Sequence, residues 1–511
     1  MSVPSHQPTP TPMYSFLRSL RGLGLTLTLL AGATILPAQA AKRWVATEHG
    51  AVGDGTTVNT KALQSAIDAC AQTGGGTLVI PAGTFLSGAL FFKQGVNLLV
   101  EKDAVLKSTI TLDDFPAIYT RWEGIERYWT SAFLNFVGMK NVEVTGAGTI
   151  DGSGDAWAGF GQGRGGRGTG QAQPAAPAGR GGAAPAAASS APSAAAAPAV
   201  AAAPVPLPLP AEVYSSPLPT TATLNVAPDR TRTPSINAAG VVLGRGTTIS
   251  ITTPPRALVF QNCTDVRVSG LTLKNQARWG YVFIYCENVV AENLTAKAEH
   301  YIPSSDGMDI DSCRKVLVTG CYFDVNDDCI SLKSGKDEDG LRVARPCEDV
   351  IIEKTVFAYG HGGAAMGSET SGGIRNVEIR DCIAEADNWA PIRFKSQPSR
   401  GGVVENITYR NMELSGVRQA VEFNMAWRMV APIAPPAKVL PIVRNVRIIN
   451  LHGTATAVGS MHGLPDSFID GITFENCDVV ANTGLTIENA RNVATAGLKI
   501  TVKTGEPVIR R

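Results

Sequence analysis

Short alternating runs of apolar and polar residues recur along most of the chain. The recurring motif is Asn or Asp, then Val or Ile, any residue, an apolar residue, any residue, Asn or Gly, and an apolar residue. Because its apolar positions repeat with a period of two, each copy predicts a short β-strand with one face toward a core. Clear copies begin at Asn141, Asp265, Asn288, Lys315, Asp349, Asn376, Asn406, Asn445, Gly471 and Asn492.

The spacing of these copies indicates how the strands are arranged. From Asp265 onward they are 23, 27, 34, 27, 30, 39, 26 and 21 residues apart, which is typical of a solenoid. The sixth position is usually Asn, Gly or Asp, as at Gly270, Asn293 and Asn411, and these residues tolerate the left-handed backbone of a tight bend. A helical solenoid would not place them so regularly. We predict an all-β, single-domain, right-handed parallel β-helix with one coil per repeat.

The beginning of this solenoid has a different pattern. Residues 60–69 are helical in character, with Leu63, Ala66, Ile67 and Cys70 on one face. A glycine run at 74–76 ends the helix, and residues 77–81 then predict a strand. Since the first coil of a solenoid needs a cover, we expect an N-terminal capping helix here.

The cysteines follow the same repeat. Cys263, Cys286, Cys313 and Cys347 lie two residues before a motif, at a position that is apolar in other coils. We therefore interpret the nine cysteines as mostly small buried thiols and not as zinc ligands. A disulfide or two stays open at this point, although an odd count forbids complete pairing.

Two segments lie outside the repeat. Arg18 and Arg21 precede an apolar run at 22–36 and a small-x-small cleavage signature at 38–40, so residues 1–40 predict a signal peptide. The mature protein would be 41–511, one catalytic domain that is secreted or periplasmic.

A low-complexity insertion rich in Gly, Ala and Pro is predicted at about 161–210. Residues 171–210 contain 18 Ala and 9 Pro, a composition that cannot bury enough surface to order itself. The sequence matches the repeat poorly as far as about residue 255.

The net charge of the chain limits the classes of molecule that it is expected to bind. The chain of 511 residues has 45 basic and 44 acidic residues and a net charge of +1. This balance argues against a nucleic-acid or membrane partner, so recognition of an acidic ligand must be local. We expect a monomer.

Acidic residues concentrate in two places that lie one coil apart. Asp306, Asp309 and Asp311 come first, and Asp327 and Asp328 follow, with 21 residues between Asp306 and Asp327. Neighbouring strands lie about 4.8 Å apart, so the two groups can stack side by side. We interpret Asp309 and Asp311 as turn-capping residues and leave them out of the candidate site.

The next two coils add an imidazole and two cations. His361 lies between two glycines, which indicates that the backbone there approaches something closely, and Arg393 and Lys395 follow one coil later. Glycoside hydrolysis needs a protonated carboxyl group and a carboxylate, and crowding of carboxylates raises at least one pKa. Cations beside the acids suit a sugar that carries a carboxylate. The residues alone indicate a hydrolase of an acidic polysaccharide.

These motifs together resemble glycoside hydrolase family 28, the polygalacturonases and their pectin-degrading relatives. The matching stretches are Gly50-Ala51-Val52-Gly53-Asp54-Gly55, Ser305-Asp306-Gly307-Met308-Asp309, Asp327-Asp328-Cys329, Gly360-His361-Gly362 and Arg393-Phe394-Lys395. The resemblance implies hydrolysis of α-1,4-galacturonosyl bonds of pectin, an acidic plant polysaccharide, by single displacement with inversion. It implies no metal and no cofactor.

The resemblance also implies roles for the site residues. Asp327 resembles the general acid, while Asp306 and Asp328 resemble the carboxylates that activate water. His361 resembles the residue that supports the acid, and Arg393 with Lys395 resembles the pair that binds the substrate carboxylate.

The chain departs from the family pattern at Ser304-Ser305, Asn326 and Phe394, where Asn-Thr, Gly and Ile are usual. None of these changes removes a catalytic group, but the first leaves subsite detail open. Three alternatives stay open. They are a hydrolase of rhamnogalacturonan or another pectic glycan, a Ca²⁺-dependent polysaccharide lyase, and a non-catalytic carbohydrate-binding solenoid.

Overall fold

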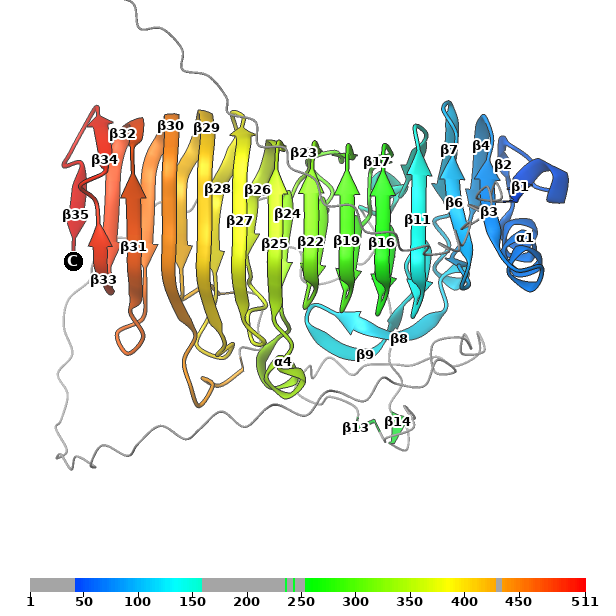
Figure 1. Cartoon of the computed structure of the whole chain (residues 1–511), viewed down its shortest axis with the longest axis horizontal. Coiled ribbons are helices and arrows are strands. Elements are labelled where there is room, and N and C mark those ends of the chain that lie inside the picture. The colour runs from blue at the N-terminus through cyan, green and yellow to red at the C-terminus, as the bar shows by residue number, and fades with distance from the viewer. Residues whose placement is uncertain (1–41, 159–234, 237–241, 244–252, 429–433) are drawn as a thin grey trace, which may run out of the picture. The chain divides into compact units, whose positions relative to one another are not determined.

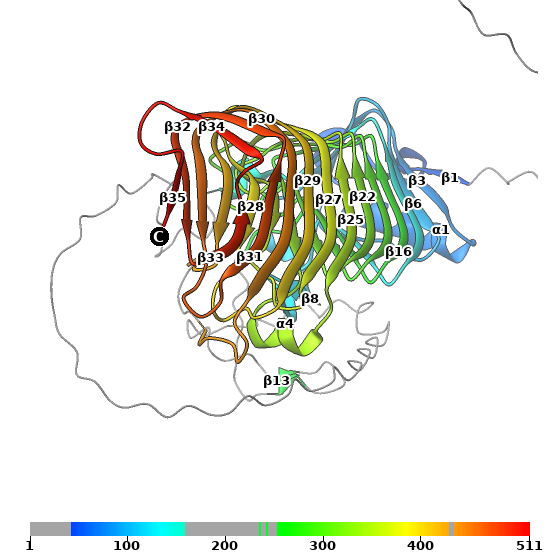
Figure 2. The same ribbon diagram turned by 60° about the vertical axis from the view of Figure 1, so that its left-hand side comes forward.

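The computed structural model describes residues 42–158, 235–236, 242–243, 253–428 and 434–511. The predicted leader at 1–40 and insertion at 161–210 lie outside the described residues. In the part that is described, the chain winds as successive coils, and each strand pairs in parallel with the equivalent strand of the coil before and after it (Figures 1 and 2). This is the predicted right-handed parallel β-helix.

The strands form three parallel ladders, here called A, B and C, and each coil after the first contributes to all three. Ladder A holds the predicted repeat and contains β1 (Arg43–Val45), β3 (Gly76–Ile80), β6 (Val96–Val100), β11 (Lys140–Gly146), β16 (Thr264–Ser269), β19 (Glu287–Glu292), β22 (Arg314–Thr319), β25 (Cys347–Glu353), β27 (Ile374–Ala384), β29 (Val403–Asn424), β30 (Ile442–His462), β31 (Ile469–Glu475) and β33 (Ala490–Ala494).

Ladder B follows ladder A within each coil. It contains β2 (Asp54–Val58), β4 (Gly83–Ser87), β7 (Ala104–Ser108), β12 (Thr149–Asp151), β17 (Thr272–Lys274), β20 (Thr295–Lys297), β23 (Tyr322–Asp324), the start of β26 (Val356–Met366), the middle of the long strands β29 and β30, the end of β27, the start of β32 (Cys477–Glu488), and β34 (Leu498–Val502).

Ladder C completes each coil. It contains β5 (Leu90–Phe91), β10 (Leu134–Val137), β15 (Leu258–Gln261), β18 (Tyr281–Ile284), β21 (Met308–Asp311), β24 (Ile330–Lys333), the end of β26, β28 (Asn388–Lys395), the ends of β29, β30 and β32, and β35 (Val508–Arg510).

Elements outside the ladders cap or flank the coils. A 3-10 turn (Ala46–His49) and helix α1 (Thr60–Gln72) lie at the first coils, while α2 (Gly154–Trp157), α4 (Asp337–Val343) and a 3-10 turn (Leu112–Asp114) lie in connections. β8 (Ala117–Trp122) and β9 (Ile125–Thr130) form an antiparallel hairpin, and β13 (Ser235–Ile236) pairs antiparallel with β14 (Val242–Leu243). None of the helices among these residues has the length and apolar character that crossing a membrane requires.

The bends of ladder A confirm and extend the prediction from the repeat. The sixth motif position has a left-handed backbone at Gly270, Asn293 and Asn411, with φ of 77°, 53° and 53°. The first position is left-handed in all ten copies, with φ between 52° and 68°. Asn and Asp adopt this conformation at low cost, and their side chains also bond from coil to coil, as Asn288 does to Asp265 at 2.9 Å. The polar positions of the motif are therefore bend residues.

The alternating apolar residues fill one continuous core between the ladders. Within it, Phe92, Phe136, Phe260 and Phe283 stack from coil to coil with ring centroids 4.3, 4.7 and 5.1 Å apart. All nine cysteines are free and buried, which confirms the buried-thiol interpretation and excludes the disulfides left open. The predicted capping helix is α1, which buries Leu63, Ala66, Ile67 and Cys70.

Removal of one ring from the phenylalanine stack should destabilise the coils strongly. Phe260 is fully buried between two other rings, so Phe260→Ala should lower the free energy of unfolding by about 3–5 kcal/mol through lost burial and a cavity. Denaturant unfolding measures this loss. The control Val480→Ala, at a position 44% exposed, should change it by less than about 0.5 kcal/mol. Equal effects of the two variants would contradict the core position of Phe260.

Candidate active site

The structure gathers the predicted site residues where ladder B turns into ladder C. Asp306 lies just before β21, and Asp327 with Asp328 lies just before β24, the next strand of ladder C. His361 lies in β26, and Arg393 and Lys395 lie in β28. Because these strands are consecutive in the ladder, residues up to 89 positions apart (395 − 306) meet in one place.

The three aspartates form a compact cluster. One carboxylate oxygen from each of Asp306, Asp327 and Asp328 lies within 4.8 Å of the other two. Asp306 and Asp328 are buried, whereas the side chain of Asp327 is 28% exposed. Asp327 Oδ1 accepts a hydrogen bond from the backbone N–H of Asp328 at 3.0 Å. The cluster is thus held firmly but can be reached from solvent through Asp327.

The two glycines around His361 allow the coils to approach. A Cβ at Gly360 would lie 2.7 Å from the backbone oxygen of Asp327, and one at Gly362 would lie 2.7 Å from Asp328 Oδ1. The backbone N–H of His361 donates to the oxygen of Asp327 at 3.0 Å, and His361 Nδ1 lies 3.4 Å from Asp327 Oδ1. The close approach expected from the sequence is therefore an approach to Asp327 and Asp328 of the aspartate cluster.

Both predicted cations contact Asp328. Lys395 Nζ bonds to Asp328 Oδ2, and an Arg393 Nη lies 3.4 Å from Asp328 Oδ1. Arg393 also donates to the backbone oxygen of His361 at 2.9 Å and to Glu422 at 2.7 Å. The ring of Trp427 lies 4.8 Å from the Arg393 guanidinium and 5.7 Å from Lys395 Nζ. Contacts within the chain thus hold both cations beside the carboxylates.

The surroundings shift the pKa values of Asp306 and Asp327 in opposite directions. Burial raises the pKa of Asp306 well above its usual value, and the negative charges of Asp309 and Asp327 add to this. Burial acts on Asp327 in the same direction, but the hydrogen bond and charge of His361, with Lys395 and Arg393, outweigh it and hold the pKa of Asp327 below its usual value. These opposite shifts favour Asp306 over Asp327 as the holder of a proton shared by the cluster.

The interpretation of Asp309 and Asp311 as turn-capping residues is wrong. Both lie in β21, where their side chains alternate with those of inward-facing Met308 and Ile310. Asp311 accepts a hydrogen bond from buried Arg121 at 3.1 Å, and Asp309 lies 3.5 Å from Lys333 Nζ. A strand of the pattern charged–apolar–charged was mistaken for a turn because charged side chains rarely face a covered surface.

Lys333 and Glu369 form a second charged layer that the sequence did not reveal. They are buried and 3.0 Å apart, and Lys333 lies beside Asp309 as well. Burial raises the pKa of Asp309 to about 8, and Lys333 only partly offsets this. Glu422 and Trp427, which contact Arg393, were also missed. Neither residue belongs to a sequence motif that by itself indicates a catalytic or binding site.

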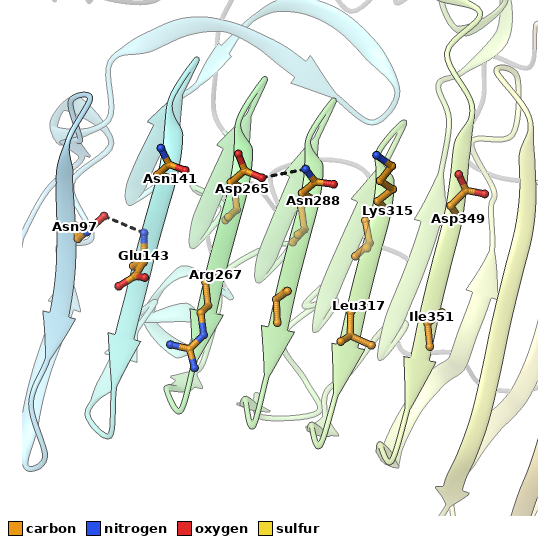
Figure 3. A pocket seen from close by; sticks show the side chains of 14 residues that line it. Asn97, Asn141, Glu143, Asp265, Arg267, Asn288, Lys315, Leu317, Asp349 and Ile351 are labelled. Atoms are coloured by element: carbon orange, nitrogen blue, oxygen red, sulfur yellow. Dashed lines mark hydrogen bonds between the residues drawn. The ribbon is translucent and has the colours of Figure 1, made fainter. Parts of the chain in front are cut away.

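A hollow in the described surface lies elsewhere. It has a volume of about 810 Å³ and runs along the outer face of ladder A, past Asn97, Asp265, Asn288, Lys315 and Leu317 (Figure 3). Its lining combines bend residues of the repeat, such as Asp265 and Asn288, with the strand residues Glu143 and Arg267. Among the described residues, the cluster of three acids lies at the aspartate site instead. The candidate active site is therefore defined by the chemistry of its residues and not by a hollow.

The chain belongs to family 28 of the glycosyl hydrolases, since residues 236–499, just over half of it, match the sequence profile of that family. It is accordingly a glycoside hydrolase. Residues 43–109 match a second profile, described as rhamnogalacturonase A/epimerase, pectate lyase-like.

Curated relatives agree with this membership. The chain is 23% identical over 443 residues to a protein named "Probable polygalacturonase" from Vitis vinifera, covering 84% of this chain and 73% of the relative. It is 26% identical over 432 residues to an exo-poly-alpha-D-galacturonosidase from Dickeya chrysanthemi, covering 81% of this chain and 63% of the relative. The chain thus spans less than two thirds of the second relative.

Solved structures share the fold. An exopolygalacturonase from Thermotoga maritima superposes with a TM-score of 0.63 at 25% identity, and the match covers 92% of each chain. A family 28 exopolygalacturonase from Yersinia enterocolitica gives a TM-score of 0.62 at 21% identity over 92% of this chain and 77% of that one.

The pKa of Asp309 predicts how stability depends on pH. Because this pKa is about 8 in the folded chain and 3.8 ordinarily, folding retains a proton that the unfolded chain releases. The stabilisation is complete below about pH 4 and is lost as pH rises toward about 8. The melting temperature of Asp309→Asn minus that of wild type should therefore increase as pH rises from 5 to 9.

Asp470→Asn is the control for this measurement. Asn492 and Arg491 lower the pKa of the partly exposed Asp470, so its contribution is fully present above pH 4 and should not change between pH 5 and pH 9. If the melting temperature of Asp309→Asn followed that of wild type in parallel over this range, Asp309 would be ionised throughout.

Proposed function

We propose that this enzyme hydrolyses α-1,4-galacturonosyl bonds of pectic polygalacturonate by single displacement with inversion. The observation that carries the proposal is the contact of both Arg393 and Lys395 with Asp328, inside a cluster of three carboxylates. A site with two fixed cations directly beside its catalytic acids suits a sugar whose own carboxylate lies next to the scissile bond. The names of the polygalacturonase relatives support the same substrate.

In the proposed reaction, Asp327 gives its proton to the glycosidic oxygen, and the leaving sugar departs with the electron pair of the broken C1–O bond. Asp306 and Asp328 orient a water molecule on the opposite side of C1 and accept one of its protons as the new C1–O bond forms. His361, 3.4 Å from Asp327, positions and tunes the acid. Arg393 and Lys395 bind the substrate carboxylate.

Binding of the substrate would raise the pKa of Asp327, the proposed general acid. In the unliganded protein, Asp327 has a lowered pKa partly because of the charges on Lys395 and Arg393. A substrate carboxylate that pairs with these cations cancels part of that effect, and the sugar also removes water from Asp327. Both changes raise the pKa of Asp327 and favour transfer of the shared proton to it from Asp306.

The stereochemical outcome rests on family membership and not on spacing. Carboxyl groups of inverting glycosidases are commonly about 6.5–9.5 Å apart and those of retaining ones about 5–5.5 Å. Here single oxygens of the three groups approach within 4.8 Å, although the cluster has two carboxylates available to hold water against the third. Inversion is therefore a proposal that needs a direct measurement.

Two alternatives have specific observations behind them. The match of residues 43–109 to a rhamnogalacturonase A/epimerase profile favours another pectic glycan as the substrate. The aspartate cluster could also hold a divalent cation, as a Ca²⁺-dependent lyase requires. Against the second alternative, Lys395 and Arg393 already balance Asp328, so a bound cation would face two positive charges.

We also propose that the enzyme is exported and meets its plant polysaccharide outside the cytoplasm. The sequence features of residues 1–40 support this proposal. A secreted or periplasmic location suits a polymeric substrate that is too large to enter a cell. That the enzyme acts as a monomer stays a prediction.

Neutralising the carboxylates one at a time should abolish hydrolysis of polygalacturonate. Asp327→Asn, Asp306→Asn and Asp328→Asn should each lower kcat by roughly 10²–10⁴-fold, because each removes a proton donor or acceptor. The control Asp349→Asn, on the outer face of ladder A, should retain full activity. Reducing-end release on polygalacturonate and on rhamnogalacturonan measures the rates, and NMR follows the anomer first formed.

The possible outcomes of that experiment distinguish the proposed function from each alternative function. Faster cleavage of rhamnogalacturonan would change the substrate, and an α-anomeric first product would contradict inversion. Activity that is lost with chelator and yields an unsaturated, ultraviolet-absorbing product would establish a lyase. Binding of polygalacturonate by wild type without any cleavage would establish a non-catalytic solenoid.

The narrow approach at Gly362 gives a second prediction. In Gly362→Ala the new methyl group would displace the Asp328 carboxylate, and a shift of this kind should lower kcat by roughly 100-fold. Gly505→Ala, where an added Cβ meets open space, should leave kcat unchanged. Circular dichroism should show both variants folded. Full activity of Gly362→Ala would mean that the position of Asp328 is not critical.

A further inference from the structure

The outer face of ladder C is covered on one side of the aspartates. Asp309, Asp311 and Lys333 point outward from β21 and β24, yet each is at most 4% exposed. The outward residues of the preceding coils, Val259 in β15 and Val282 in β18, are also buried. Since an outward face of a solenoid is normally solvated, another part of the chain must lie over these coils.

The cover is the β8–β9 hairpin, which runs beside the coils of β11, β16, β19 and β22 next to α4 (Figure 1). Arg121 of β8 is buried and bonds to Asp311 at 3.1 Å and to Ser312 at 2.8 Å. The ring of Trp122 stacks on Trp279 with centroids 5.9 Å apart, and Lys333 Nζ lies 4.7 Å from the Trp279 ring. The hairpin thus covers the charged layer next to the catalytic cluster.

The hairpin is packed and is not a loose loop, since Ile118, Tyr119 and Trp122 of β8 are buried. Ala132, Val259, Trp279, Val282, Ile284, Tyr285 and Val343 form a second hydrophobic cluster on the outside of ladder C. At the far end of the hairpin, Glu126 accepts hydrogen bonds from Tyr285 at 2.8 Å and from Arg342 of α4 at 2.7 Å. The backbone N–H of Lys336 donates to the oxygen of Gly124 at 3.0 Å. The hairpin is therefore fixed at both edges.

Arg278 lies between the β8–β9 hairpin and the aspartate cluster. It precedes Trp279 and is partly exposed. Burial lowers the pKa of Arg278, and the negative charges of Glu123 at the hairpin turn, Asp306 and Asp327 oppose this. The buried Nε of Arg278 has no hydrogen-bond partner. A guanidinium with unused donor capacity beside the acids suits a second carboxylate of the substrate.

On the other side of the cluster the same face is open. Beyond Arg393 and Lys395, ladder C continues with Asn424, Ser460 and Thr486, all partly exposed in the described chain. His462 and Glu488, farther along, have side chains 41% and 37% exposed. A sugar chain can extend over these coils but meets the hairpin, Trp279 and Arg278 immediately past Asp306.

We propose that the β8–β9 hairpin closes the substrate groove at one end, so that the enzyme acts on chain ends and releases one short product of fixed length, with Arg278 binding the carboxylate of the terminal unit. The inference rests on the proposed function, because it assumes that polygalacturonate is cleaved at the aspartates. A groove blocked a short distance from the scissile bond admits only the units that fit between the bond and the block. Internal bonds of a long chain cannot reach the carboxylates.

The product profile of wild-type enzyme on polygalacturonate tests this directly. We expect a single short product from the first turnovers, with viscosity falling slowly in proportion to the bonds cut. An early ladder of oligomers with a rapid fall in viscosity would overturn the inference and leave the proposed function intact. Absence of any hydrolysis would instead refute the proposed function.

Polymers with blocked ends sharpen the test. One polygalacturonate preparation carries reducing ends reduced with borohydride, and another carries unsaturated non-reducing ends left by a lyase. We expect the initial rate to fall at least tenfold on the polymer whose blocked end is the one that enters the closed groove. Undiminished rates on both polymers would overturn end-directed action.

The role of Arg278 is tested by Arg278→Met. If Arg278 binds the terminal carboxylate, KM for galacturonate oligomers should rise by about tenfold, the loss of one charge-assisted contact, while the product length stays the same because the hairpin remains. The matched control is Arg267→Met, at an exposed ion pair on the outer face of ladder A. An unchanged KM in Arg278→Met would remove Arg278 from the proposal.

Discussion

The active site depends on the stacking register between coils. The backbone N–H groups of Gly307 and His361 donate to the oxygens of Asp328 and Asp327, at 3.0 Å in each case, and these bonds fix three successive coils against one another. Side chains in a strand alternate between faces, so a slip by one residue would turn the outward side chains of that strand into the core. The left-handed bend residues and the glycines around His361 hold the register that chemistry requires.

Charge balance is the second constraint on the site. Three carboxylates within 4.8 Å repel one another, and Lys395 and Arg393 relieve this only for Asp328 and Asp327. Burial, with nearby negative charge, raises the pKa of Asp306 well above its usual value and favours its protonated form. In the proposed mechanism, the substrate brings its own negative charge to the two cations and so shifts the proton toward Asp327.

Much of this was visible in the sequence, because the repeat and the site motifs are local patterns. Motif positions predicted the coils, the bends and the capping helix, and spacing by coil predicted that Asp306, Asp327, His361 and Arg393 would meet. The β8–β9 hairpin was missed because it belongs to no repeat. Asp309 and Lys333 were missed as a buried layer, since their burial depends on a cover whose position no local pattern gives.

The most direct test of this account is the infrared carboxyl spectrum at pH 6, compared between wild type and Asp306→Asn. Protonated carboxylic acids have a carbonyl band that ionised carboxylates lack. The account predicts that wild type shows a protonated carboxyl signal that Asp306→Asn loses, in addition to the signal of Asp309 that both retain. Identical spectra would mean that Asp306 carries no proton. The three aspartates would then not share a proton in the way that this account requires.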